Sequence, residues 1–256
     1  MEVGFAGAGN MTAAMARGWA GADDGPGTMV FCDLERDRAA ALAEEVAGEV
    51  VDDLSELAGR VRLVVLGVKP NALEAVASEL APAGPEALLS MLAATPLERI
   101  EAAFPGVPAV RVMPNQPVEV RRGVLCHSRG GAVTEEVASE ISRLLGLLGT
   151  AIELPEEKLE AAMAVMSCSP AYVAMVAEIL TEAGVREGLT PDEAALFVRE
   201  TLVGTGELLA ERDAESVRRS VAPPGGATEA GLQQLEKLEL RAAFDAAVEA
   251  SLVRFR

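Results

Sequence analysis

A glycine turn between a short apolar run and a helix-forming segment is the feature that most constrains this chain. The stretch is residues 3–11, VGFAGAGNM, in which residues 3–6 read as a β-strand and the residues after the turn favour a helix. Gly7 permits the tight bend, Gly9 lets a pyrophosphate approach the backbone, and the helix start offers free N–H groups to the phosphates. Thr12 stands where the fingerprint has its third glycine. The turn predicts a dinucleotide site, and an ordinary tight turn between a strand and a helix is the alternative.

A second expected strand, residues 29–33 (MVFCD), ends in an acidic residue, Asp33. Asp33 lies 26 residues after Gly7, where a carboxylate can bind the ribose 2′-hydroxyl of NAD and repel the 2′-phosphate of NADP. Arg36 and Arg38 follow closely and would act in the opposite direction if they faced the cofactor, and otherwise they are charges on a helix surface. Asp53, at the start of a further expected helix, is also counted among the cofactor candidates. The residues leave the choice between NADH and NADPH open.

The next strands expected along the chain bring further candidates to the same edge of the sheet. Residues 62–68, RLVVLGV, have the apolar character of a parallel strand that is buried on both faces. Lys69 and Pro70 follow directly, and side chains after the carboxyl end of a central parallel strand face the ligand crevice. Ala93 follows the strand expected at residues 87–91, where small side chains leave room for a ring. Lys69 is one of only three lysines, so we expect it to meet the cofactor, with an exposed strand end as the alternative.

Three later segments complete the expected sheet. Strands are predicted at residues 109–113, 123–128 and 150–154, the last two as antiparallel or edge strands. With the helices between them, they predict an open α/β domain of the doubly wound Rossmann type. Asn115, in a loop between two prolines, is a candidate to aim its amide at a ligand.

The character of the chain changes at Pro155. From Glu156 onward no convincing strand is visible, and the chain reads as amphipathic helices with short breaks. We therefore predict a dinucleotide-binding domain, residues 1–155, followed by an all-α domain, residues 156–256. A helical domain this rich in alanine exposes much apolar surface by itself, which predicts homodimerisation.

Composition and charge argue against several function classes. The formal net charge of −18 repels phosphates, so no nucleic-acid partner is expected. The three cysteines are widely spaced and His127 is the only histidine, so we expect reduced thiols and no metal site. The first strand begins at once, which leaves no room for a signal peptide, and we see no apolar run long enough to span a membrane. These features predict a cytoplasmic protein without a membrane partner.

A second glycine-rich segment, residues 223–228 (PPGGAT), lies between two expected helices. Its prolines stiffen the approach, Gly225 and Gly226 bare the backbone, and Thr228 begins the next helix. Backbone N–H groups at a helix start bind anions, and here the anion would be a small carboxylate with the Thr228 hydroxyl beside it. A helix cap after a turn is the alternative.

Six motifs, in this order, resemble those of the pyrroline-5-carboxylate reductase family, the enzymes of the last step of proline biosynthesis. They are GAGNM (7–11), VKP (68–70), MPN (113–115), SPAY (169–172), EAGVREGL (182–189) and PPGGAT (223–228). The resemblance runs nearly from end to end. It implies a Rossmann domain, a helical domain that interlocks with its partner, and an active site at the interface of a homodimer or of a ring of dimers.

The resemblance also implies which residues form the site. Cofactor contacts carry over to Gly7, Gly9, Asn10, Met11, Val68, Lys69, Pro70 and Ala93, and substrate contacts to Gly225, Gly226, Ala227, Thr228 and Glu157. The glycine loop would hold the substrate carboxylate. The chain departs from the family where SGSGPAY appears as SCSPAY (167–172), where Pro223 replaces a serine, and at Asp33, where NADP-preferring members carry a small or donating residue. The first two departures leave the identity of the substrate open.

The reaction implied by the resemblance is the NADPH- or NADH-dependent reduction of 1-pyrroline-5-carboxylate to L-proline, by hydride transfer to a cyclic imine. Thr228 would be the catalytic residue that orients or protonates the ring nitrogen. The alternatives are reduction of another cyclic imine, a β-hydroxyacid dehydrogenase-like enzyme, and a diverged nucleotide-binding paralogue without turnover. The dehydrogenases place a catalytic lysine on the helical domain, and neither Lys158 nor Lys237 lies in a fitting motif.

Overall fold

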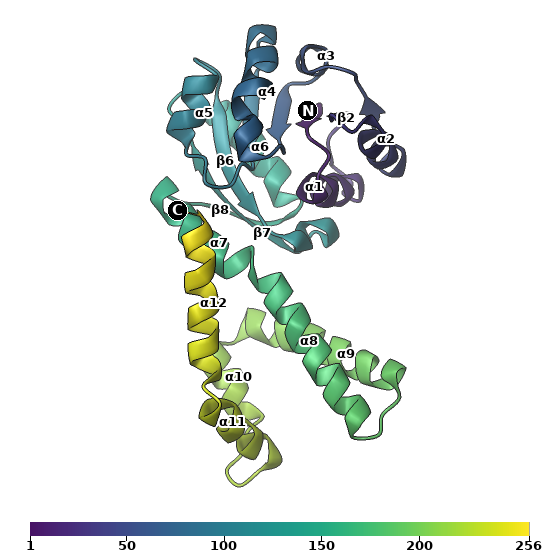
Figure 1. Cartoon of the computed structure of the whole chain (residues 1–256), viewed down its shortest axis with the longest axis vertical. Helices are drawn as coiled ribbons and strands as arrows, with labels where there is room; N and C mark the ends of the chain where they lie inside the picture. Colours follow the sequence, from purple (N-terminus) through teal and green to yellow (C-terminus); the bar gives the residue numbers. More distant parts are fainter. Residues whose placement is uncertain (256) are drawn as a thin grey trace. The chain divides into compact units, whose positions relative to one another are not determined.

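A computed structural model of the chain describes residues 1–255, with side chains up to Arg254. It divides into two compact units, Met1–Cys168 and Ser169–Val253, each of which is described by itself. The first unit is built on one eight-stranded sheet in the order β3-β2-β1-β4-β5-β6-β7-β8 (Figure 1). The strands are β1 (Val3–Ala6), β2 (Met29–Cys32), β3 (Glu49–Val50), β4 (Leu63–Leu66), β5 (Ala87–Ser90), β6 (Ala109–Pro114), β7 (Gly123–Arg129) and β8 (Gly149–Glu153).

The direction of the strands identifies the end of the sheet at which a ligand would bind. Strands β1 to β6 run parallel, whereas β7 is antiparallel to β6 and β8 is parallel to β7. From β1 the chain moves outward to β2 and β3, and it then returns to the other side of β1 with β4. Ligands of open α/β sheets bind at the carboxyl ends of the strands where the order reverses in this way. The Rossmann-type fold and the antiparallel and edge strands predicted from the sequence are confirmed.

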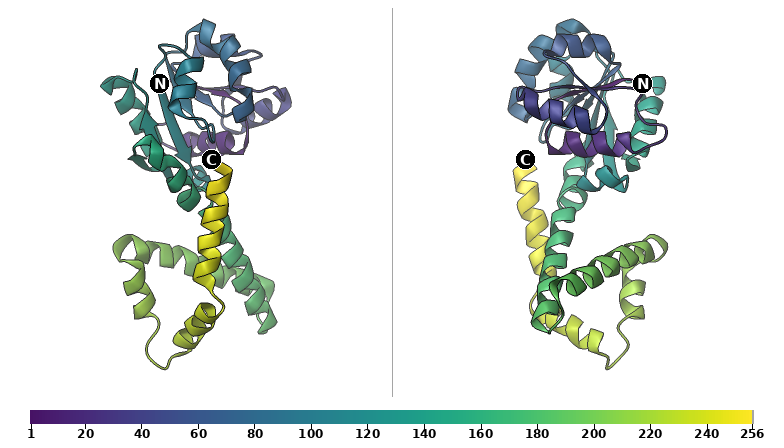
Figure 2. Two further views of the ribbon diagram at one scale, coloured as in Figure 1. Left: turned by 60° about the vertical axis from the view of Figure 1, so that its left-hand side comes forward. Right: turned by 90° about the vertical axis from the view of Figure 1, so that its right-hand side faces the viewer.

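Helices cover both faces of the sheet (Figures 1 and 2). They are α1 (Asn10–Ala20), α2 (Arg36–Glu45), α3 (Leu54–Arg60), α4 (Leu73–Leu80), α5 (Leu97–Ala103), α6 (Glu135–Gly146) and α7 (Leu159–Met166). One core lies against α1, α2 and α6 and contains the stacked rings of Phe5 and Phe31, with Trp19 beside them. The second core lies against α3, α4 and α5 on the other face. Because both faces are covered, every residue of β1, β2, β4 and β5 is buried, as their near-continuous apolar sequences predict.

The first unit extends beyond Pro155, because a short 3₁₀ turn, η4 (Glu156–Lys158), and helix α7 pack on β6 and β7. Arg111, which lies in β6 and is only 1% exposed, holds this segment by ion pairs to Glu156 and Glu160 at 3.0 and 2.8 Å. Removing either partner of a buried pair leaves an uncompensated charge, so this contact fixes the segment firmly to the sheet.

The second unit consists of helices alone among the residues that the structure describes. They are α8 (Ser169–Arg186), α9 (Pro191–Glu211), α10 (Ala214–Ser220), α11 (Ala227–Lys237) and α12 (Leu240–Phe255). Helix α9 begins with a capping box, in which Thr190 and Glu193 satisfy each other's backbone N–H groups. Its described apolar side chains are mostly exposed or half-buried, and only Ala194 and Val217 are buried.

One stretch of the chain, Glu156–Arg186, is long and apolar enough to cross a membrane by length and composition, with 11% of its most apolar window buried inside the chain. The prediction that no such run exists is wrong for this stretch. Its residues 161–177 contain no charged side chain, although serines, small residues and Pro170 interrupt the large apolar ones. Length and composition alone are weak evidence for a membrane span, because the helices of a soluble protein pass the same test.

Candidate active site

The two glycines of the first turn meet different demands in the structure. Gly7 has a φ angle of 99°, and a Cβ atom added to it would lie 2.9 Å from the backbone of Gly67, so the protein itself requires a glycine there. Gly9 has an ordinary φ of −74°, and a Cβ atom added to it would meet no protein atom closer than the Gly67 oxygen at 4.0 Å. Nothing in the protein demands a bare backbone at Gly9. The open space beside it fits a pyrophosphate that approaches the turn.

The helix that follows is prepared to receive an anion. Gly9 is the N-cap of α1, no side chain caps the helix, and no acidic residue lies in its first turn. The first-turn N–H groups of Asn10, Met11 and Thr12 have no intrahelical acceptor, and they lie at the positive end of the helix dipole. These bare donors and the space at Gly9 fit the diphosphate of a dinucleotide.

Thr12 replaces the third glycine of the fingerprint, and the structure compensates on the neighbouring strand. Thr12 is 1% exposed and faces Gly67, the residue after β4, whose added Cβ atom would lie 2.3 Å from the Thr12 hydroxyl oxygen. The close approach that the third glycine usually provides is here provided by Gly67. Sequence reasoning did not assign this role to Gly67.

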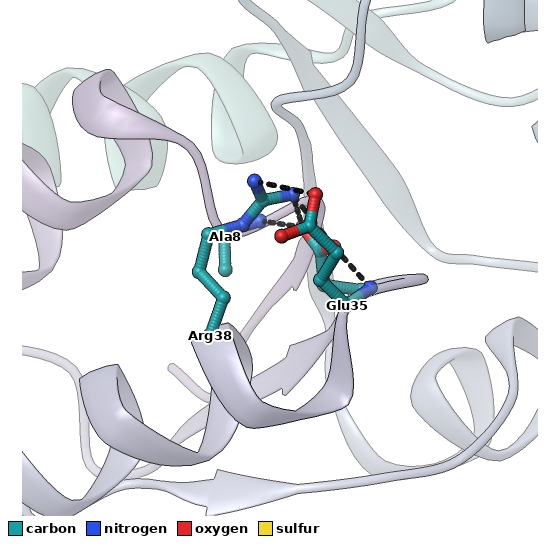
Figure 3. A network of polar contacts seen from close by, with 4 residues as sticks. Ala8, Glu35 and Arg38 are labelled. Carbon is teal, nitrogen blue, oxygen red and sulfur yellow. Dashed lines mark hydrogen bonds and ion pairs between the residues drawn. The ribbon is translucent and has the colours of Figure 1, made fainter.

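Asp33, at the end of β2, is joined directly to the glycine turn. One carboxylate oxygen accepts the Ala8 N–H at 2.6 Å and the other accepts the Glu35 N–H at 2.8 Å. Arg38 donates to both oxygens, at 2.8 and 2.9 Å, and its side chain reaches from α2 toward the turn that contains Ala8 (Figure 3). Burial alone would raise the pKa of Asp33, but the hydrogen bonds from Ala8, Glu35 and Arg38 outweigh it and lower the pKa below its usual value.

Two other cofactor candidates are engaged elsewhere. Arg36, the first residue of α2, forms an ion pair with Asp52, and both side chains are more than half exposed. Asp53 caps α3, because its carboxylate accepts the Glu56 N–H at 2.7 Å. A capping acid with a glutamate three residues later was visible in the sequence, and it accounts for Asp53 without a cofactor. The cofactor roles of Arg36 and Asp53 stay predictions.

The remaining cofactor candidates lie at the carboxyl ends of β4, which pairs with β1, and of β5, which pairs with β4. A Cβ atom added to Gly7 would lie 3.1 Å from the Val68 side chain, so the two turns are adjacent. Lys69 is exposed, forms no ion pair among residues 1–254, and precedes the 3₁₀ turn η1 (Pro70–Ala72). The carbonyl of Ala93 accepts a hydrogen bond from the Thr95 hydroxyl at 3.0 Å. The structure thus brings Gly7, Val68 and Lys69 together at the carboxyl ends of β1 and β4.

Asn115 has a structural role and is not free to bind a ligand through its amide. Its Nδ2 donates to the Met166 carbonyl at 3.0 Å, and its Oδ1 accepts the Val124 N–H at 2.9 Å. The side chain ties the end of β6 to β7 and to the end of α7. The hypothesis that its amide points at a ligand is therefore wrong for this conformation, although the rigid loop after β6 is present. Sequence reasoning missed both partners because the pairing of β6 with β7 brings Val124 to Asn115, and Met166 lies 51 residues further along the chain.

The second glycine loop lies in the helical unit and begins α11. Gly225 has a φ of 75°, which favours glycine, and Gly226 is the N-cap of α11 with Ala227 and Thr228 in its first turn. The Gly225 N–H donates to the Glu229 carboxylate at 2.7 Å, and the Gly226 N–H donates to the Pro223 carbonyl at 3.0 Å. An acidic side chain of the chain itself therefore lies at this helix start, a feature that sequence reasoning missed.

Thr228 and Glu157 are both exposed in the single chain. Glu157 lies in η4 of the first unit, between Glu156, whose carboxylate accepts the Leu97 N–H at 2.7 Å, and Lys158. Thr228 lies in the second unit. Among the described residues, no group of three His, Cys, Asp or Glu side chains is arranged to hold a metal ion.

Comparison with known proteins identifies the family of this chain. Residues 156–256 match the family described as pyrroline-5-carboxylate reductase dimerisation, and residues 2–94 match NADP oxidoreductase coenzyme F420-dependent. A pyrroline-5-carboxylate reductase of Synechocystis sp. is 33% identical over 80% of this chain and 78% of its own length. One from Pseudomonas aeruginosa is 31% identical over 99% of this chain and 95% of its own length.

The chain belongs to the pyrroline-5-carboxylate reductase family. A crystal structure of the Plasmodium falciparum pyrroline carboxylate reductase with NADP bound superposes with a TM-score of 0.90, at 25% identity, and covers 99% of this chain and 96% of that one. Membership in the pyrroline-5-carboxylate reductase family and the two-part architecture were both predicted from the six motifs, and both are confirmed.

Proposed function

We propose that this chain reduces 1-pyrroline-5-carboxylate to L-proline with NADH or NADPH, as the names of its relatives in the pyrroline-5-carboxylate reductase family suggest. The observation that carries the proposal is the bare, open backbone at Gly9, at the start of an uncapped helix, in a chain that matches this family over nearly its whole length. The Plasmodium falciparum relative was solved with NADP bound, which supports a nicotinamide cofactor here.

The cofactor would be held by the first unit. Gly9, Asn10 and Met11 would bind the diphosphate through backbone N–H groups, which act locally against the chain's net charge of −18. The Gly7 N–H donates to the Cys32 carbonyl at 2.8 Å, so Gly7 would contribute by shaping the turn beside the cofactor. Residues 68–70 and Ala93 would lie near the nicotinamide. When bound, the reduced nicotinamide supplies a hydride to the substrate.

The glycine loop of the second unit would hold the substrate. Its carboxylate would accept N–H groups at residues 225–228, with Glu157 as a further contact. The Thr228 hydroxyl oxygen would accept a hydrogen bond from the N–H of the protonated ring nitrogen, which orients the imine and stabilises its protonated form. The hydride adds to the imine carbon, the C=N π electrons pass to nitrogen, and nitrogen keeps its proton as the product amine forms. A protonated imine is electrophilic enough to need no strong acid, which suits a chain with one histidine.

The helical part would join two copies. The match to a dimerisation family supports this for residues 156–256, and we keep residue 155 as the end of the dinucleotide-binding domain. Exposed apolar side chains on α8 and α9 would lie in the interface, among them Val173, Met175, Ile179, Phe197 and Val203. A homodimer or a ring of dimers would complete the active site between copies. The three free cysteines support a reducing, cytoplasmic location, and we propose no nucleic-acid or membrane partner.

The test is a turnover assay in which the purified protein is mixed with 1-pyrroline-5-carboxylate and with NADH or NADPH in separate reactions. We expect oxidation of the cofactor, followed by its absorbance, and formation of proline in equal amount. Tight cofactor binding without turnover would contradict the proposal and favour a nucleotide-binding paralogue.

Reduction of another cyclic imine is the second candidate, and specific observations favour it. Pro223 and Cys168 depart from the family on the substrate side, and the Glu229 carboxylate lies on the loop that would bind the substrate's own carboxylate. Parallel assays with cyclic imines that carry or lack a carboxylate distinguish the two candidates. A higher kcat/KM for an imine without a carboxylate would favour the second.

A further inference from the structure

We propose that Asp33 makes this chain select NADH over NADPH by accepting hydrogen bonds from the unphosphorylated ribose of the adenosine half. The proposal rests on the proposed function only in placing a nicotinamide cofactor on the first glycine turn. A family model and a solved relative that this chain resembles are both described with NADP, so a preference for NADH must come from residues of this chain itself.

The Asp33 carboxylate is fixed at the position that reads this ribose. It lies at the end of β2, the strand beside β1, and its hydrogen bond from Ala8 ties it to the middle residue of the Gly-Ala-Gly turn. An acid in this place on a dinucleotide fold accepts the ribose 2′-hydroxyl. Its side chain is only 5% exposed, and donors from Ala8, Glu35 and Arg38 hold both oxygens within 2.9 Å. The carboxylate therefore cannot swing away to admit a phosphate without breaking several hydrogen bonds.

The nearby cations are already paired with acids. Arg38 is bound to both oxygens of Asp33 and to Glu35 at 3.1 Å. If Arg38 turned to a 2′-phosphate, it would leave the nearly buried Asp33 carboxylate without its counter-ion, which is costly. Arg36 pairs with Asp52. This exposed pair is weak, so Arg36 is the one cation that a phosphate could recruit cheaply.

The residues around Asp33 would repel a 2′-phosphate, and their side chains offer it no uncharged hydrogen-bond donor. Leu34 follows Asp33 with a fully exposed side chain that can donate no hydrogen bond to a phosphate. The segment 33–38, DLERDR, carries three acids against two arginines. A phosphate monoester brings a charge of about −1.5 to −2 at neutral pH. Bringing that charge next to an ionised Asp33 disfavours NADPH. A ribose hydroxyl of NADH carries no charge and can replace one of the two Arg38 contacts on the carboxylate, while Arg38 keeps the other.

The first experiment measures the dissociation constants of NADH and NADPH for the full-length protein without substrate, together with kcat/KM for both cofactors. We expect NADH to bind at least tenfold more tightly and to give the higher kcat/KM. Equal binding, or tighter binding of NADPH, would overturn the proposal. If neither cofactor is oxidised but NADH binds more tightly, the proposed reaction fails and the inference about Asp33 stands.

Substitutions then test the role of each residue. In Asp33→Ser the repulsion is removed and Arg38 is released, so NADPH should bind at least tenfold more tightly and NADH more weakly than in the wild type. Adding Arg38→Ala to Asp33→Ser should remove most of the gain for NADPH. A gain that survives Arg38→Ala would show that Arg38 is not the released cation and would contradict that step.

A matched control uses Asp37→Ser, which removes an equal charge from an exposed position in the first turn of α2, four residues after Asp33. It should leave the ratio of the two dissociation constants unchanged, and a shift as large as that of Asp33→Ser would mean that general charge decides, against the proposal. If Asp33→Ser fails to fold, Asp33→Asn retains an acceptor for a backbone N–H and removes the charge. It should lower the preference for NADH, and an unchanged ratio would overturn the proposal.

Discussion

Thr12 and Gly67 form a size-matched pair, since a Cβ atom added to Gly67 would lie 2.3 Å from the Thr12 hydroxyl oxygen. The dinucleotide fingerprint has a glycine at the position of Thr12 on α1, and in this chain the glycine of this contact is Gly67, directly after β4. The hydroxyl itself is buried and has no hydrogen-bond partner among the described residues. Close packing between α1 and the loop after β4 therefore depends on the missing side chain at Gly67.

This pair gives a stability prediction with a rescue. Gly67→Ala should lower the free energy of unfolding by about 1–3 kcal/mol, because an added methyl group overpacks the contact with Thr12. Thermal unfolding of the single variant and of Thr12→Ala/Gly67→Ala checks this. The double variant should recover much of the loss, since Thr12→Ala removes the clashing oxygen. Equal melting temperatures for Gly67→Ala and the double variant would contradict this explanation.

A substitution at Gly9 should separate binding from folding. The space beside Gly9 and its φ of −74° accommodate an alanine, so Gly9→Ala should leave the melting temperature nearly unchanged. The added methyl group would occupy the place of the diphosphate, so cofactor affinity should fall by about tenfold or more. Gly59→Ala, in α3 and also without close neighbours, is the matched control and should leave cofactor affinity unaltered. Normal cofactor binding by Gly9→Ala would place the diphosphate elsewhere.

Thr228→Ala tests the proposed hydrogen-bond partner of the ring nitrogen. Loss of one preorganised hydrogen-bonding group in an active site typically costs roughly 10²–10³ in rate, so kcat should fall at least tenfold. Cofactor affinity, measured without substrate, should be unchanged because Thr228 belongs to the substrate loop. Thr228→Ser keeps the hydroxyl and should recover most of the rate. An unchanged kcat in Thr228→Ala would remove this residue from the mechanism.

Glu229 predicts a change in substrate affinity. Its carboxylate accepts the Gly225 N–H at 2.7 Å, in the loop proposed to hold the substrate carboxylate, so the two acids compete for one donor. Glu229→Gln removes the charge, and relief of this like-charge contact should lower the substrate KM by about threefold or more. The KM of the cofactor serves as an internal control and should not change. A higher substrate KM in Glu229→Gln would show that Glu229 helps to bind the substrate.

His127 predicts how stability depends on pH. Burial lowers its pKa below the usual value of 6.5, and Arg129 adds to this against the opposing effect of Glu153. The unfolded chain binds this proton more readily than the folded one, so the stabilisation is present above about pH 6.5 and is lost as pH falls through the lowered pKa. The contribution of His127 to the slope should reach at most about 1.4 kcal/mol per pH unit, because one group binds one proton. Urea unfolding of His127→Leu between pH 7 and 5 should show a flatter dependence than the wild type.

Much of the fold followed from local sequence patterns. The strands β1, β4 and β5 could be predicted from their apolar runs, because a strand buried on both faces must be apolar throughout. The turn at Gly7 could be predicted because only glycine adopts its φ of 99° without strain. These features depend on a few neighbouring residues.

The parts of the site that sequence did not reveal depend on partners far along the chain or on which atom a side chain meets. The sequence indicated no partner for the amide of Asn115, whereas in the fold this amide is hydrogen-bonded to the backbone of Met166 and Val124. Asp33 was identified as a cofactor candidate, whereas its bond to Ala8 depends on how β2 and the glycine turn meet. The contact between Gly225 and Glu229 is different, because it is local. A glutamate in the first helical turn often reaches back to a preceding N–H, so this contact could have been predicted from the spacing.

The sparse interior of the second unit has a consequence for how the molecule is made. With only Ala194 and Val217 buried among its described apolar side chains, this unit gains little from folding alone. In the proposed dimer a second copy would cover these helices, so the last step of folding would depend on the collision of two chains. Newly synthesised chains at low concentration would then remain incompletely folded, and dilution of the mature protein would destabilise its fold as well as its assembly.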